Sequence, residues 1–144
     1  MVDSGNVDAA ILAALRADAA LMAAIPGGVY YAVAPPGVVN FGIVDRLVHE
    51  ADDDVYGLEP GAERYTYLAK AVITGSSSDP ARAAALRIRA VLDGNDTIAP
   101  TGYALTRPIA ELEAMRSVEV DAANPDRRVQ HWGGQYAVTV QRTT

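Results

Sequence analysis

Apolar residues recur at helical spacing over the first 25 positions of the chain, which predicts an amphipathic helix. The positions that form this stripe are Val7, Ile11, Leu15, Met22 and Ile25. Asp18 stands where the stripe calls for another apolar residue, and as an N-cap it would start a second, short helix. We therefore favour a helix broken at Asp18 over one straight helix, with Ser4 or Asn6 capping the first piece. Residues 26–28, Pro-Gly-Gly, end the second piece.

Three segments that follow have the pattern of β-strands. Residues 29–33 form a short one, and residues 34–37, Ala-Pro-Pro-Gly, must leave the sheet because proline has no N–H to donate. Residues 41–48 form the second. The third, residues 65–74, has apolar side chains on both faces, which predicts a central strand. One of its faces carries Tyr65, Tyr67, Ala69, Ala71 and Ile73, and the other carries Leu68 and Val72.

A second helix is predicted over residues 80–93. Pro80 suits the first helical position, and Gly94 suits the position just past the end. Its buried stripe consists of Ala81, Ala84, Ala85, Ile88, Val91 and Leu92. Arg82 and Arg89 lie on the opposite side. Leu86 falls on this arginine side, which makes it a candidate subunit contact.

The hydrophobic pattern that predicts strands is less regular in the last third of the chain. Residues 103–106 suit a strand, whereas residues 108–114 have helical propensity although Pro108 also suits an edge or a turn. Val118 and Val120 alternate with polar residues, as do the apolar residues at 136, 138 and 140. This alternation predicts two antiparallel strands, each with one solvent-facing side, joined by a hairpin loop over residues 122–135.

Residues 50–64 are acidic and interrupted by glycine and proline, so they cannot bury enough apolar surface to pack. They predict a long exposed loop between two strands. Asp52, Asp53 and Asp54 within it lack the alternating acids and final Glu of an EF-hand, so a solvated loop is favoured over a cation site. A more specific interpretation is that these aspartates make an electrostatic contact with a basic surface of a partner protein.

Composition narrows the classes of function. A chain of 144 residues without cysteine suits one domain, over residues 1–144, without disulfides or thiolate metal sites. No apolar run approaches the ~20 residues of a membrane span, and the N-terminus lacks a basic signal-peptide region. We expect a protein made and soluble in the cytoplasm. The net charge of −6 disfavours binding to nucleic acid or anionic membranes.

Candidate chemistry is sparse. The two histidines, His49 and His131, lie far apart in the sequence, and no metalloprotease, nucleophile-elbow, phosphate-loop or dinucleotide motif is present. Residues 75–79 between a strand and a helix suit helix capping better than an anion site, since the loop lacks a lysine. Trp132 is either part of the core or an interface anchor. We expect no catalytic residue, no metal and no cofactor.

Four segments, in this order, resemble the tail terminator, or tail-completion, proteins of long-tailed bacteriophages and related gene transfer agents. The first is LRADAAL with PGGVY and an APPG turn, and the second is YLAKAVITGSSSDPARAAALRIRAVLDG. The third is TGY at residues 101–103, and the fourth is HWGGQY before the last strand. Together they span nearly the whole chain.

The resemblance implies an α+β fold: a mixed, mostly antiparallel sheet with the N-terminal helix and the 80–93 helix packed against it. It also implies a hexameric ring in the tail or neck of the virion that caps the finished tail tube and stops its polymerisation. The implied partners are other copies of the chain, the tail tube protein and a neck or head connector protein. The 50–64 loop is larger than the family pattern. Candidate subunit or tube contacts are Asp52, Asp53, Asp54, Leu86, Arg82, Arg89 and Trp132.

Three other interpretations stay open on the sequence. The chain is compatible with another neck component, such as a head-completion or stopper protein. A small metal- or phosphate-dependent enzyme would use the aspartates at 52–54 or the 76–79 loop. A ligand-binding module would need a deep apolar pocket.

Overall fold

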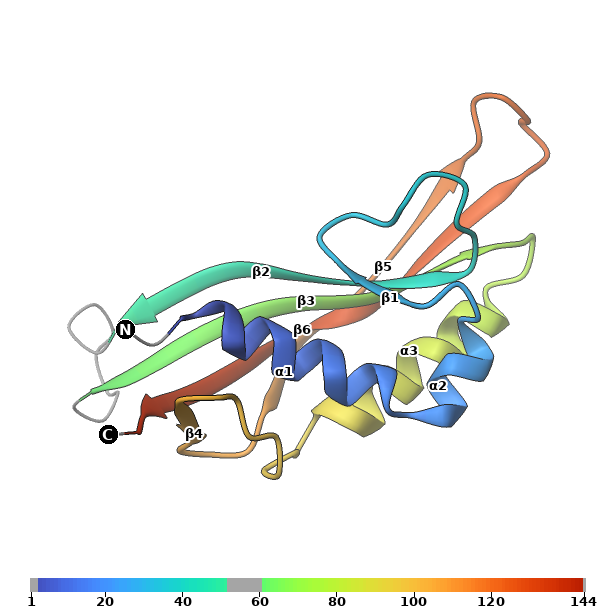
Figure 1. Ribbon diagram of the computed structural model, residues 1–144. Helices are drawn as coiled ribbons and strands as arrows, with labels where there is room; N and C mark the ends of the chain where they lie inside the picture. Colours follow the sequence, from blue (N-terminus) through green and yellow to red (C-terminus); the bar gives the residue numbers. More distant parts are fainter. Residues whose placement is uncertain (1–2, 52–60, 144) are drawn as a thin grey trace.

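The computed structural model describes residues 3–51 and 61–143 and has an α+β fold, as predicted. Three helices lie against one face of a curled, mostly antiparallel sheet of six strands (Figure 1). In chain order the elements are α1 (Gly5–Arg16), α2 (Ala19–Ala24), β1 (Val29–Tyr31), β2 (Phe41–Ala51), β3 (Ala62–Thr74), α3 (Asp79–Leu92), β4 (Tyr103–Leu105), β5 (Ala110–Val120) and β6 (Arg128–Arg142).

The sheet is built around β3 and β6. The strand order is β1-β2-β3-β6-β4, and β5 also pairs with β6. Only β1 and β2 run parallel; every other pair is antiparallel. β4 pairs with the C-terminal end of β6 and β5 with its N-terminal part, so both strands lie on the same side of β6. The prediction that residues 65–74 form a central strand is therefore confirmed.

The core lies between the sheet and the helices. The predicted face of β3 is buried, with Tyr65, Tyr67, Ala69 and Ala71 fully inaccessible and Ile73 only 4% exposed. Opposite it lie the predicted helical stripes, including Val7, Ile11 and Leu15 of α1 and Ala81, Ala84, Ile88 and Leu92 of α3. The hydroxyl of Tyr67 stays satisfied at this depth because it donates to Asp8 at 2.5 Å.

The predicted break at Asp18 is confirmed. Asp18 is the N-cap of α2 in an extended conformation, and its carboxylate accepts a hydrogen bond from the backbone N–H of Leu21 at 2.9 Å. At the start of α1, Ser4 occupies the cap position, but its side chain makes no capping hydrogen bond. Asp3 accepts the N–H of Gly5 instead, at 2.9 Å.

The predicted acidic loop is wrong at both ends, because β2 continues to Ala51 and β3 begins at Ala62. The charged residues there pair across the two strands. Arg64 donates to Glu50 at 2.8 Å, and His49 lies 3.1 Å from Glu63. Such cross-strand pairs stabilise a hairpin whose sequence alone is typical of a loop. Asp52, Asp53 and Asp54 lie outside the described residues.

The last third of the chain contains more strand than predicted. Residues 110–114 belong to β5 and not to a helix. The hairpin loop is also shorter than 122–135, because β6 already begins at Arg128. Val118 and Val120 pair with β6 as expected but are 55% and 57% exposed, since this end of the hairpin projects beyond the helices (Figure 1).

Candidate subunit-contact groove

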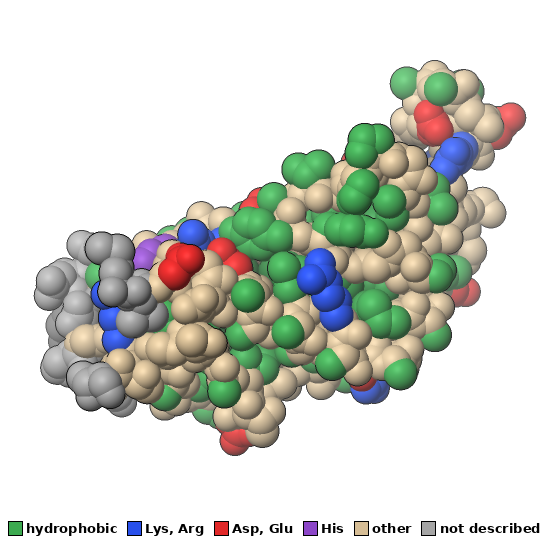
Figure 2. Space-filling model, in the orientation of Figure 1, with side chains coloured by type: hydrophobic (Ala, Val, Ile, Leu, Met, Phe, Trp, Pro, Cys, Tyr) green, Lys and Arg blue, Asp and Glu red, His purple; other side chains and the backbone are tan. Residues whose placement is uncertain are grey.

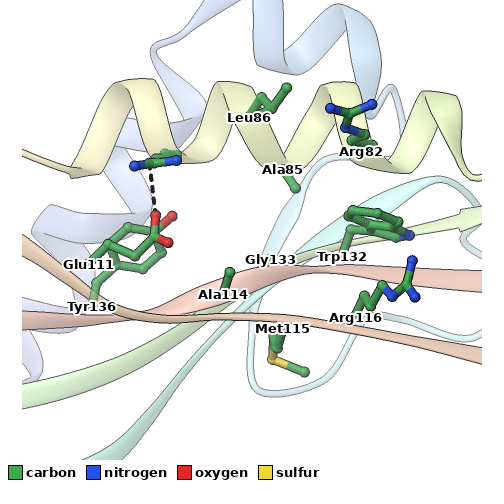
Figure 3. A pocket seen from close by; sticks show the side chains of 11 residues that line it. Arg82, Ala85, Leu86, Glu111, Ala114, Met115, Arg116, Trp132, Gly133 and Tyr136 are labelled. Carbon is green, nitrogen blue, oxygen red and sulfur yellow. Dashed lines mark ion pairs between the residues drawn. The ribbon is translucent and has the colours of Figure 1, made fainter.

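A groove lies between α3 and β5 on the face of the sheet that carries the helices. Its volume is about 340 Å³, and β6 forms its floor (Figure 3). Its wall on α3 is formed by Arg82, Ala85, Leu86 and Arg89; β5 contributes Glu111, Ala114, Met115 and Arg116, and β6 contributes Trp132, Gly133 and Tyr136.

The groove exists because α3 does not cover β5. The buried stripe of α3 packs onto β3 and β6, and the next position toward β5 is Ala85. Across the gap, β5 presents Ala114, so at this point the helix and the strand face each other with methyl groups (Figure 3). A helix and a strand with larger residues at these positions would fill the space, because protein interiors pack without voids.

Trp132 forms the centre of the floor. It is half-buried, packs against the hydrophobic core and also lines the groove. Its role as an interface anchor stays a prediction. The guanidinium carbon of Arg116 lies 5.6 Å from the Trp132 ring centroid, a cation–π arrangement. The indole N–H of Trp132 is buried and has no hydrogen-bond partner among the described residues.

The groove is positively charged although the whole chain carries a net charge of −6. Its lining has three arginines and one glutamate, so two positive charges remain. Arg89 pairs with Glu111 at 3.1 Å. Arg82 and Arg116 form no ion pair with any carboxylate of residues 3–51 or 61–143. At the bottom, burial raises the pKa of Tyr136, so its phenol stays protonated and neutral.

Four of the residues singled out in the sequence come together in this groove. Arg82, Leu86 and Arg89 lie one turn apart along α3, and Trp132 reaches the same space from β6. Leu86 at the rim of the groove is 53% exposed. Arg116 was not among the predicted contacts, because residues 108–114 were not assigned to a strand that would lead up to it. A strand extended over residues 110–120 would have placed Arg116 beside Trp132, its pairing partner in β6.

The two histidines lie on opposite faces of the sheet. His49 stacks on Tyr65 on the helix-bearing face, with 4.3 Å between ring centroids. His131 faces the other way and lies 2.7 Å from Glu119. Burial, together with nearby Lys70, lowers the pKa of His131 against the opposing effect of Glu119. No group of three or more His, Asp or Glu side chains within the described parts of the chain is placed to hold a metal ion.

The 75–79 loop behaves as a helix start. Pro80 occupies the first turn of α3, and the hydroxyl of Ser77 accepts the N–H of Asp79 at 3.2 Å. Ser78 occupies the N-cap position but makes no side-chain capping hydrogen bond, so the structure supports the capping interpretation only through Ser77. None of the helices in the described ranges is long and apolar enough to cross a membrane.

A second apolar surface lies on the opposite face of the sheet. The segment at 32–40 folds over β2 and β3 there, and Val33 and Val39 on it are 78% and 51% exposed. Apolar side chains gather over this segment in Figure 2. Ala34 and Pro35 of the Ala-Pro-Pro-Gly turn line this surface, which also includes Phe41, Leu68 and Lys70. The molecule therefore presents two different apolar surfaces on its two sides.

Known structures share this fold. A chain of the virion of a native gene transfer agent particle aligns over 96% of this chain and 96% of its own length, with a TM-score of 0.69 and 21% sequence identity. A second solved structure aligns over 100% of this chain and 99% of its own, with a TM-score of 0.60 and 14% identity. No protein-family model matches the sequence, and no curated protein matches it.

Proposed function

We propose that this protein is a structural component of a phage-like particle: a tail terminator that forms a ring on the finished tail tube. The ring stops addition of tube subunits and offers a surface for the head connector. The observation that carries the proposal is the fold shared with a chain of the gene transfer agent virion over 96% of both chains. The ordered segments that resemble tail terminators add independent support from the sequence.

The distribution of surfaces favours a ring over a symmetric dimer. A twofold dimer uses one self-complementary patch, whereas a head-to-tail contact joins two different patches and closes into a ring when the rotation allows. This chain carries a positively charged groove on one side of its sheet and the apolar 32–40 surface on the other. Two unlike surfaces are what a head-to-tail contact requires, and six subunits is the ring size implied by the resemblance.

Light scattering coupled to size exclusion and electron microscopy with purified tail tubes test the proposal. We expect a hexamer in solution and rings at one end of tubes, together with shorter tubes when the protein is present during polymerisation. A strict monomer that leaves tube length unchanged would refute the proposal. Rings that bind only the head connector, and never a tube end, would assign the chain to another neck position, such as a stopper.

A further inference from the structure

We propose that the groove between α3 and β5 receives the acidic 52–60 segment of a second copy of this chain. The proposal rests on the self-association proposed above, and it pairs the groove with this acidic segment rather than with the 32–40 surface. It assigns a partner to Arg82 and Arg116, which pair with no carboxylate of the described residues.

The charges of the two surfaces are complementary. Residues 52–60, DDDVYGLEP, contain four carboxylates and no basic residue. They account for −4 of the net charge of −6, which leaves −2 for the other 135 positions of the 144. The groove carries Arg82 and Arg116, which pair with no carboxylate of residues 3–51 and 61–143, in a predominantly acidic protein. Arginine binds carboxylates in a bidentate manner, and such pairing selects partner and register.

The apolar content of the segment also suits the groove. Val55, Tyr56 and Leu58 follow the three aspartates. The groove offers the half-buried Trp132 and the exposed Leu86 as apolar contacts. Its volume of about 340 Å³ is at the small end of the ~300–1,000 Å³ range of ligand pockets, which suits a short peptide segment better than a large ligand.

The same subunit cannot supply the segment to the centre of its own groove. Trp132 pairs with Ala71 of β3, and Ala71 is nine positions from Ala62, the first residue of that strand. At ~3.3 Å per residue, Ala71 lies about 30 Å from Ala62. A nine-residue segment fixed at Ala51 and Gly61 must go out and return, so it reaches about 17 Å at most. The nearer end of the groove holds the Arg89–Glu111 pair. The occupant must therefore come from another copy, in a head-to-tail contact.

Charge reversal on each side tests this contact. In one variant Arg82→Glu and Arg116→Glu reverse the groove, and in the other Asp52→Lys, Asp53→Lys and Asp54→Lys reverse the segment. Each variant alone should be monomeric by light scattering, with a far-UV spectrum like that of the wild type. Their equimolar mixture should assemble again beyond a dimer, because the intact groove meets the intact segment and the reversed groove meets the reversed segment, each with opposite charge.

The controls reverse exposed charges elsewhere. Arg107→Glu and Asp96→Lys change residues that are exposed and lie outside the groove lining. Both should keep the wild-type oligomer. An oligomer that survives groove reversal would overturn the proposal, as would a mixture that stays monomeric or a control that dissociates to the same extent.

A peptide experiment separates this inference from the proposed function. Trp132 is the only tryptophan, so its fluorescence reports on the groove directly. A synthetic peptide of residues 51–61 should change the emission of the segment-reversed variant, whose own segment cannot compete. Affinity should fall at least about tenfold in the groove-reversed variant and with the three aspartates of the peptide replaced by asparagine. Absence of peptide binding overturns the inference even if rings form, whereas rings that fail to cap tubes overturn only the proposed function.

Discussion

Replacing Asp18 should weaken the contact between α2 and α3. The second of these helices forms one wall of the groove. One Asp18 carboxylate oxygen accepts the N–H of Leu21 at 2.9 Å and the Nε of Arg87 at 2.6 Å; the other accepts the Nη2 of Arg87 at 2.7 Å. One side chain thus caps α2 and clamps α3 in a bidentate pair. Three substitutions separate these two contributions.

The expected loss of stability comes mainly from removal of the N-cap. Asp18→Ala leaves the first turn of α2 without its acceptor, and loss of an N-cap costs about 1 kcal/mol. The bidentate pair adds less, because Arg87 is 45% exposed and solvent screens the interaction. For a chain of this size, 1 kcal/mol lowers the melting temperature by about 3 °C. Asp18→Asn keeps an acceptor but removes the charge, and Arg87→Ala removes only the pair, so both should cost less than Asp18→Ala.

The pH dependence gives the sharper test. Hydrogen bonds from Arg87 hold the pKa of Asp18 below its ordinary value of 3.8, with the Leu21 N–H acting in the same direction against burial. A lowered pKa in the folded state means that the stabilisation is complete above the unfolded-state value and is lost as the pH falls through the folded-state value. The difference in stability between wild type and Asp18→Asn should therefore be present at pH 7 and close below pH 3.8.

Urea unfolding monitored by circular dichroism at pH 7 and at acidic pH measures both quantities. Equal midpoints for wild type and Asp18→Ala at pH 7 would show that the cap contributes nothing. A difference between wild type and Asp18→Asn that persists or grows at acidic pH would refute the role assigned to the charge. Arg87→Ala should show the same pH dependence as Asp18→Asn, since both remove the same pair.

Other residues give predictions of the same kind. Gly133→Ala should destabilise the fold by about 1–3 kcal/mol, because the added Cβ would lie 2.1 Å from a backbone oxygen of β3. Gly75→Ala is the matched control: its added Cβ meets nothing closer than 3.9 Å, so its free energy of unfolding should be nearly unchanged in the same assay. Tyr67→Phe should cost about 1.5–3 kcal/mol by removing the buried hydrogen bond to Asp8, and an unchanged melting temperature would contradict this. Leu86→Asp should change monomer stability by no more than about 0.5 kcal/mol but weaken assembly in light scattering, and loss of folding would instead assign Leu86 to the core.

Local patterns predicted the elements whose burial is one-sided and regular. The 3.6-residue stripe of α3 and the two-residue alternation of β3 both survive in the structure, because each element buries one continuous face against the core. Asp18 could be predicted for a different reason: a capping side chain acts on the backbone three residues later, which is a local interaction. No long-range contact was needed for these predictions.

Charged segments were harder to assign because their partners lie on other strands. Glu50 and Arg64 are 14 positions apart, and their pairing turns an apparent loop into the ends of β2 and β3. In β5 the alternation of Val118 and Val120 predicted only the second half of the strand, whereas residues 110–114 are in a strand because they pair with β6. Cross-strand register is a property of two segments together, so neither sequence alone shows it.

The sequence by itself determined the helices, the central strand, the break at Asp18 and the choice of Arg82, Leu86, Arg89 and Trp132 as contact candidates. Only the tertiary structure decided that these four line one groove, that Arg116 joins them and that Arg89 is already paired with Glu111. The reason is physical. Periodicity reports which side of an element is buried, whereas the space between two elements depends on how α3, β5 and β6 pack, and that packing sets which charges remain free for a partner.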